Sequence, residues 1–203
     1  MNPHIDIRVV ELLSARLCHD LVGPIAAISN GVELMGDDDP DFVRDAVALV
    51  GDSAHKAANR LQFYRFAFGY RQGKIAGPPP HALARDLFDG TSVLCEYGED
   101  VRQLGLEWQK LACNLLLVGS ESLPRGGRLI VMAGPDGPEL EGIGEGNGPS
   151  SEIRAALALT APVAELSART VAAYFAGLLG ESLCCRIAVT GTPGSFRFKV
   201  EKV

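Results

Sequence analysis

Two adjacent residues with complementary chemistry, His19 and Asp20, stand shortly before a Gly-Pro pair at Gly23 and Pro24. Imidazole can act as a nucleophile near neutral pH without first losing a proton, and a phosphorylated ring nitrogen stays reactive enough to pass the group on. A neighbouring carboxylate could bind the other ring N–H and fix the tautomer that presents the free lone pair. His19 is therefore a candidate phosphoryl acceptor, and Asp20 a candidate orienting or acid-base group.

The segment that must position this pair, about residues 5–35, has the pattern of an amphipathic helix. Its apolar residues fall three or four positions apart, or multiples of that: Val10, Leu13, Leu17, Leu21, Ile28, Val32 and Met35. Since each helical residue advances about 100°, His19 projects roughly 160° away from the centre of this stripe. We therefore expect its side chain to face solvent.

The outward face beside His19 is the predicted docking surface for a partner. Small side chains follow the histidine there, so a partner could approach closely. Pro24 removes the N–H that would bond the carbonyl of Asp20, and Gly23 adds a helix penalty of about 1 kcal/mol, so we expect a bend. The residues assigned to partner docking are Arg16, Gly23, Pro24, Ala26 and Asn30.

A simpler interpretation is that His19 is an ordinary surface histidine and that Gly-Pro merely ends a helix. The thiol of Cys18 does not offer an alternative nucleophile, because neighbours on a helix point about 100° apart and cannot readily share a proton. His55 lies beside the apolar seam of the next helix, where a structural or surface role is expected.

That second helix follows a short acidic turn. Asp39 is placed to cap its first turn, and Pro40 suits the first helical position, where a missing N–H costs nothing. Apolar residues then alternate at spacings of 4 and 3, the heptad pattern of a bundle helix: Val43, Val47, Val50, Ala54, Ala57, Leu61, Tyr64 and Phe68. Two helices alone cannot enclose a core, so we predict a homodimer whose hairpins form a four-helix bundle.

Glycines and three consecutive prolines in residues 73–80 mark the predicted domain boundary. We assign residues 1–74 to the helical-hairpin domain and residues 75–203 to an α/β sandwich, which gives an α + α/β fold class. Within the second domain we expect a helix over 101–118, a strand over 128–133, a loop over 134–149, a helix over about 164–180, and a C-terminal β-hairpin around the turn GTPG.

Composition excludes several classes of protein. The net charge of -6 and the absence of any Lys/Arg cluster argue against a nucleic-acid or anionic-membrane surface. Five cysteines without a C-x-x-C pair encode neither a disulfide framework nor a zinc site, and free thiols suit a cytoplasmic location. No run of 18 apolar residues is present, so no membrane span is expected.

Residues 18–35, CHDLVGPIAAISNGVELM, resemble the H-box of histidine kinases. In that motif a phospho-accepting histidine is followed by an acidic residue, an apolar residue and, three positions further on, a proline. The order and the spacing match at His19, Asp20, Leu21 and Pro24. The resemblance implies that the helical hairpin is similar to the dimerisation and phosphotransfer domain of those kinases, which forms a four-helix bundle as a dimer.

Residues 111–131 are similar to the N-box helix and the following strand of the kinase ATPase domain, but the nucleotide-binding positions differ. Val118 and Glu121 stand where the family has a metal-chelating asparagine and a lysine. In GEGNG, residues 144–148, Gly144 stands where the aspartate of the adenine box would be. An H-box without ATP boxes resembles, over essentially the whole chain, the ChpT-type histidine phosphotransferases of alphaproteobacterial cell-cycle phosphorelays.

This resemblance implies a relay intermediate with no ATP and no metal of its own. His19 would take a phosphoryl group from the receiver aspartate of a CckA-like hybrid kinase and pass it to CtrA-like and CpdR-like response regulators. The Mg²⁺ for the reaction is expected on the receiver domain, because phosphoryl transfer needs in-line geometry and charge neutralisation more than covalent help.

Two other functions stay open from the sequence. A divergent ATP-dependent histidine kinase would bind nucleotide and phosphorylate itself, and the residues at 118 and 121 disfavour it. A non-catalytic dimeric scaffold that binds a regulator through the bundle would not need His19.

Overall fold

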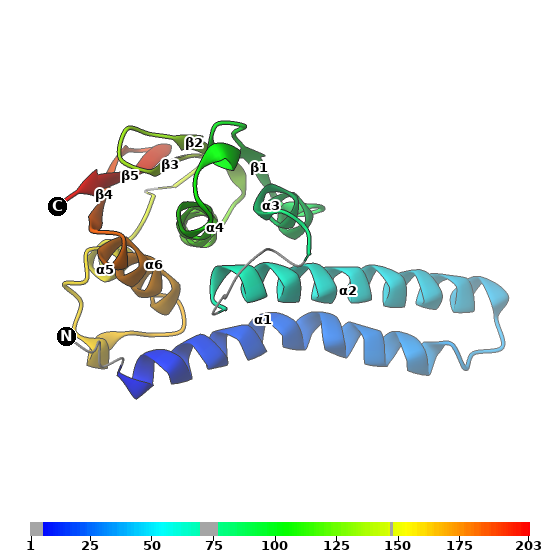
Figure 1. Ribbon diagram of the computed structural model, residues 1–203. Coiled ribbons are helices and arrows are strands. Elements are labelled where there is room, and N and C mark those ends of the chain that lie inside the picture. Colours follow the sequence, from blue (N-terminus) through cyan, green and yellow to red (C-terminus); the bar gives the residue numbers. More distant parts are fainter. Residues whose placement is uncertain (1–5, 70–76, 147) are drawn as a thin grey trace.

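The computed structural model describes residues 6–69, 77–146 and 148–203. Two long helices, α1 (Ile7–Leu34) and α2 (Pro40–Ala67), form a hairpin that projects from an α/β part (Figure 1). The side chain of Asp39 accepts a hydrogen bond from the backbone N–H of Asp41, as predicted for the cap of α2. No helix within the described ranges is long and apolar enough to cross a membrane.

The α/β part is built on a mixed sheet. Within the described residues its five strands lie in the order β1-β2-β3-β5-β4, with β1 parallel to β2 and the other neighbours antiparallel. The elements are α3 (Pro80–Phe88), β1 (Val93–Tyr97), η1 (Val101–Gln103), α4 (Leu106–Glu121), β2 (Gly127–Ala133), β3 (Pro138–Ile143), α5 (Ser151–Leu157), η2 (Val163–Glu165), α6 (Val171–Ser182), β4 (Cys185–Thr192) and β5 (Ser195–Lys202). The predicted class, a helical hairpin followed by an α/β domain, is confirmed.

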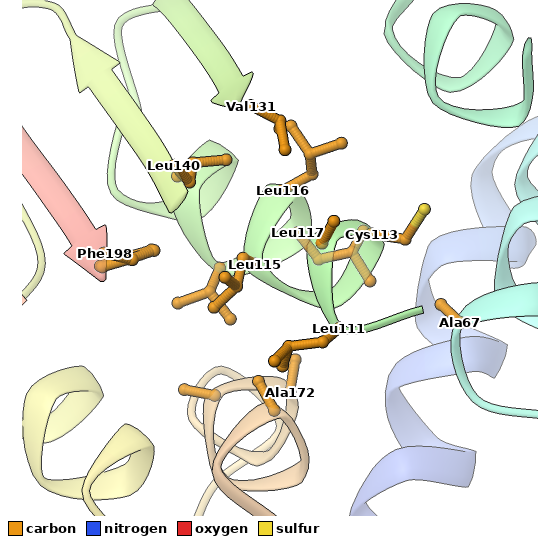
Figure 2. Close-up of a cluster of buried hydrophobic side chains, with 14 of the residues drawn as sticks. Ala67, Leu111, Cys113, Leu115, Leu116, Leu117, Val131, Leu140, Ala172 and Phe198 are labelled. Atoms are coloured by element: carbon orange, nitrogen blue, oxygen red, sulfur yellow. The ribbon is translucent and has the colours of Figure 1, made fainter. Parts of the chain in front are cut away.

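The core lies between one face of this sheet and the helices α4 and α6. Every residue from Leu111 to Gly119 is buried, which explains why α4 is apolar on all sides. Leu116 lies beside Val131 of β2, and Leu111 lies beside Ala172 of α6 (Figure 2). On β5 the buried residues alternate with polar ones, so the opposite face of the sheet is the more exposed one.

The prediction of a loop over residues 134–149 was wrong, because β3 lies within it. Its glycine and acidic residues do not give the alternating apolar pattern of a strand. The structure explains why glycine and glutamate occur here. A Cβ at Gly142 would clash with the ring of Phe196, so only glycine allows the two strands to pair here. Glu141 on the other face of the sheet forms an ion pair with Arg197 of β5.

Two predicted helices begin later than their apolar spacing suggested. The helix predicted over 101–118 starts at Leu106, because Asp100 caps the short helix η1 and Gly105 then separates it from α4. The helix predicted over 164–180 starts at Val171, after η2 and a turn over residues 168–170. In both cases the helical spacing of apolar residues continues across residues that are not helical, so spacing alone cannot locate the start of the helix.

The heptad seam of α2 divides into two rows. Val43, Val50, Ala57 and Tyr64 are buried or half-buried in the hairpin, whereas Val47, Ala54 and Leu61 are exposed. Gly31 lets the helices approach, since a Cβ there would lie 2.6 Å from Cγ2 of Val50. Several apolar residues of both helices are exposed, and we call this set the outer apolar face: Val22, Ile25, Val32, Val47 and Leu61.

Polar contacts join the hairpin to the α/β part. Asn114 of α4 donates to the carbonyl of Ala67 at 2.9 Å, at the C-terminal end of α2. Near the middle of α1, the Arg16 guanidinium forms an ion pair with Glu121 at the end of α4. The predicted boundary between residues 74 and 75 falls in the segment 70–76, outside the described residues, and stays a prediction.

Replacing Glu121 with alanine should destabilise this junction. The side chain of Arg16 is 12% exposed, and the substitution would leave its charge without the paired carboxylate. We expect the free energy of unfolding to fall by about 3 kcal/mol, the lower end of the range for breaking one side of a buried pair. Urea unfolding followed by circular dichroism measures this loss.

The matched control is Glu145→Ala, which removes a pair with Arg125 whose side chains are 77% and 80% exposed. Exposed pairs contribute about 1 kcal/mol or less. Equal losses for Glu121→Ala and the control would contradict a buried junction.

Candidate functional site

His19 lies on α1 with its side chain 87% exposed, so the predicted solvent-facing position is confirmed. Its Nδ1 lies 3.2 Å from Oδ1 of Asp20. An ionised carboxylate can only accept a hydrogen bond, so this contact favours the tautomer with the proton on Nδ1. The Nε2 lone pair is then free to meet a partner in solvent.

Asp20 accepts hydrogen bonds from two side chains of α2. Its Oδ2 accepts a hydrogen bond of 2.5 Å from the hydroxyl of Tyr64 on α2. Its backbone carbonyl accepts one of 2.7 Å from Nη1 of Arg60, one turn earlier on the same helix. Nε of Arg16 lies 3.7 Å from Oδ2, within ion-pair distance but too far for a hydrogen bond. Asp20 is therefore held at both its side chain and its main chain.

Pro24 leaves a backbone carbonyl of α1 free to accept a hydrogen bond from Arg60. A residue with an N–H at position 24 would bond the carbonyl of Asp20 within α1, but proline has none. α1 continues as a helix through this position and changes direction near its middle, as expected from the sequence (Figure 1). The free carbonyl then accepts from Arg60, which ties α1 to α2 beside His19.

Tyr64 is a fixed donor for this arrangement. The residue is 6% exposed, and its ring stacks on Phe68 with a centroid distance of 5.6 Å and an interplanar angle of 27°. Burial, with a further contribution from the hydrogen bond to Asp20, raises the pKa of Tyr64 well above its ordinary value. Its hydroxyl therefore keeps its proton in the neutral range and continues to donate to the carboxylate.

The structure corrects the predicted position of Arg16. We expected this residue on the outward face as a partner contact, but its side chain lies between α1 and the α/β part. There it pairs with Glu121 and donates to the carbonyl of Ala168 at 3.3 Å. Helical spacing placed Arg16 on the outward side of an isolated helix, whereas the second half of the chain packs against that side.

Charges within this junction influence one another. Burial opposes the charged form of Arg16, yet Glu121 and Asp20 raise its pKa on balance. Burial also raises the pKa of Glu121, and the neighbouring guanidinium of Arg16 offsets this only in part.

The other predicted docking residues lie where the helix pattern put them. Gly23, Ala26 and Asn30 are exposed, and Pro24 is half-buried. A Cβ added to Gly23 would find no atom within 4 Å, so the space beside this glycine is open to a partner. Their role in docking stays a prediction.

The positions that the sequence resemblance matched to kinase nucleotide-binding residues serve packing and pairing. Val118 is fully buried in the core of the α/β part, and Glu121 binds Arg16. The backbone N–H of Gly144 donates to the carbonyl of Gly194, which connects the end of β3 with the β4–β5 turn. Asn147, in the same segment as Gly144, lies outside the described residues.

Sequence reasoning missed the two α2 residues that hold Asp20. Tyr64 was assigned only to the apolar seam, and Arg60 was not singled out. The available signal was a hydroxyl-bearing residue at a seam position with an arginine four residues before it, since residues at this spacing share one helix face. Pairing them with Asp20 requires knowing how the two helices are aligned.

Comparisons with known proteins identify the family of this chain. The family described as histidine phosphotransferase C-terminal domain matches residues 80–193. The chain is 30% identical over 205 aligned residues to protein phosphotransferase ChpT of Brucella abortus (strain 2308), covering 94% of this chain and 93% of that protein. A solved structure of a bacterial phosphotransferase matches with a TM-score of 0.76 and 28% identity, covering 97% of each chain. The chain belongs to the ChpT-type histidine phosphotransferase family.

Proposed function

We propose that this protein is an intermediate of a multistep phosphorelay, which receives a phosphoryl group on Nε2 of His19 from one receiver aspartate and passes it to another. The observation that carries this proposal is the exposed imidazole with its Nδ1 against a fixed carboxylate. An exposed ring can enter the active site of a second protein, and a held ring presents the same nitrogen each time.

The transfer balances without loss of a proton. The Nε2 lone pair attacks phosphorus, an N–P bond forms, and the bond from phosphorus to the aspartyl oxygen breaks, so the receiver regains its carboxylate. The imidazole becomes positively charged with its proton still on Nδ1, and Asp20 lies where it stabilises that charge. In the onward step a second carboxylate oxygen attacks phosphorus and the electron pair returns to Nε2.

Under this proposal the protein needs no ATP. The burial of Val118 and the pairing of Glu121 with Arg16 support it, because both positions are occupied by contacts of the fold. The divalent cation that neutralises charge during transfer would be Mg²⁺ on the receiver domain.

The partners follow from the same proposal. We assign the donor to a CckA-like hybrid kinase and the recipients to CtrA-like and CpdR-like response regulators. Gly23, Ala26 and Asn30 would contact the receiver, because they lie exposed on the face that presents His19. A cytoplasmic location is part of this assignment, and the five free cysteines are compatible with a reducing compartment.

We also propose a homodimer formed through the outer apolar face. Val47 and Leu61 are 52% and 57% exposed on α2, and Val22 and Ile25 are 62% and 53% exposed on α1. Several exposed apolar side chains on one hairpin favour an association site, and pairing two hairpins would complete a four-helix bundle.

Substituting His19 with alanine tests the acceptor assignment. The purified protein is incubated with a ³²P-labelled receiver domain of a CckA-like kinase, or with labelled ATP alone. Acid-labile, base-stable label should arrive from the receiver and not from ATP, and His19→Ala should abolish it. His55→Ala, which removes another exposed histidine of the hairpin, should retain the label.

Other outcomes of this experiment decide between the functions. Label from ATP alone would make the protein a kinase. Label that persists in His19→Ala would show that another residue is the acceptor. If no label arrives from either source, the non-catalytic scaffold explains the protein better.

The double substitution Val47→Glu and Leu61→Glu tests the dimer. Two charges in an apolar contact should convert the dimer to a monomer in analytical ultracentrifugation without lowering helix content. Leu94→Glu is the control, because Leu94 is 68% exposed on β1, outside this face. A wild-type protein that sediments as a monomer would overturn the proposed dimer.

A further inference from the structure

We propose that Tyr64 is a positioning residue for phosphoryl transfer. By donating to Oδ2 of Asp20, it keeps Oδ1 against Nδ1 of His19 and thereby selects the tautomer that presents Nε2. This inference deepens the proposed function and rests on it, because it assigns a role in the reaction to a residue that no substrate touches.

The imidazole of His19 can rotate about its side-chain torsions unless a hydrogen bond holds it. A side chain that is 87% exposed has little packing to hold it, so its orientation depends on its hydrogen bond to Asp20. A carboxylate on a helix surface can itself turn about two side-chain torsions. An ordered histidine therefore requires that Asp20 be held by something rigid.

Tyr64 provides that rigidity. Its neighbours Phe63 and Ala67 on α2 are 0% exposed, and its own ring stacks on Phe68. The hydroxyl reaches Oδ2 of Asp20 at 2.5 Å, a short distance typical of a hydrogen bond to a charged acceptor. The buried end of α2 is thus connected to the exposed ring through one carboxylate.

Arg16 is the competing candidate for this role, but its geometry does not suit it. The Nε atom of Arg16 lies 3.7 Å from Oδ2, and the guanidinium pairs with Glu121 instead. Without the Tyr64 hydroxyl, the attraction of Arg16 would turn the carboxylate toward the domain junction and away from Nδ1. Loss of this hydroxyl should therefore loosen His19 while leaving the fold in place.

The test is Tyr64→Phe, which removes one oxygen and keeps the aromatic stacking. In ¹⁵N-histidine-labelled protein, the imidazole shifts of His19 should move from the Nδ1–H tautomer toward a mixture. Phosphorylation of His19 by phosphoramidate, a small phosphodonor that bypasses receiver docking, should slow by about tenfold, the lower end of the range for loss of an orienting partner. Melting curves report whether the variant is folded.

Two further variants separate positioning from a general structural effect. Tyr97→Phe removes a buried hydroxyl that has no hydrogen-bond partner among the described residues, and it should change neither rate nor tautomer. If Tyr64 acts through Asp20, then Tyr64→Phe should slow phosphorylation no further in an Asp20→Ala background.

An unchanged rate and an unchanged tautomer in Tyr64→Phe would overturn the inference, as would an equal slowing in Tyr97→Phe. A wild-type protein that accepts no phosphoryl group from any donor would instead refute the proposed function. The NMR comparison would still decide whether Tyr64 fixes the ring.

Discussion

The organisation of this protein depends on the hydrogen bonds made by Asp20. Its carboxylate links the exposed His19 to the buried Tyr64, and its carbonyl links the bent helix α1 to Arg60. The proposed function places conflicting requirements on His19, because it must lie in solvent to reach a partner and must also hold one orientation. Asp20 reconciles them, since one side chain contacts both the exposed ring and the core.

The bend at Pro24 has a structural value beyond its effect on helix direction. A regular helix would use the carbonyl of Asp20 for an internal hydrogen bond, and Arg60 would then share this acceptor with a backbone N–H. Because proline has no N–H to donate, α1 and α2 form a polar contact beside His19. Pro24 thus shapes α1 and also helps to align α1 with α2 at the site.

Two positions of α4 that the sequence resemblance matched to kinase nucleotide-binding residues serve the core and the junction with the hairpin. Val118 fills the core, and Glu121 neutralises Arg16 on α1. A buried ion pair contributes little net stability because desolvation costs about as much as pairing returns. It does restrict how the two parts fit together, since any other alignment would leave a buried charge unpaired. The junction therefore restricts how α1 lies against the α/β part.

The sequence by itself determined the features that depend on neighbours within a few residues. Helical spacing predicted both long helices and the exposure of His19, Asp39 predicted a cap, and Pro24 predicted the bend. Only the tertiary structure decided the burial of Arg16, the strand β3 and the contact between Tyr64 and Asp20, which are 44 residues apart. Local periodicity fixes which side of an element a residue occupies, whereas its partner depends on how distant elements pack.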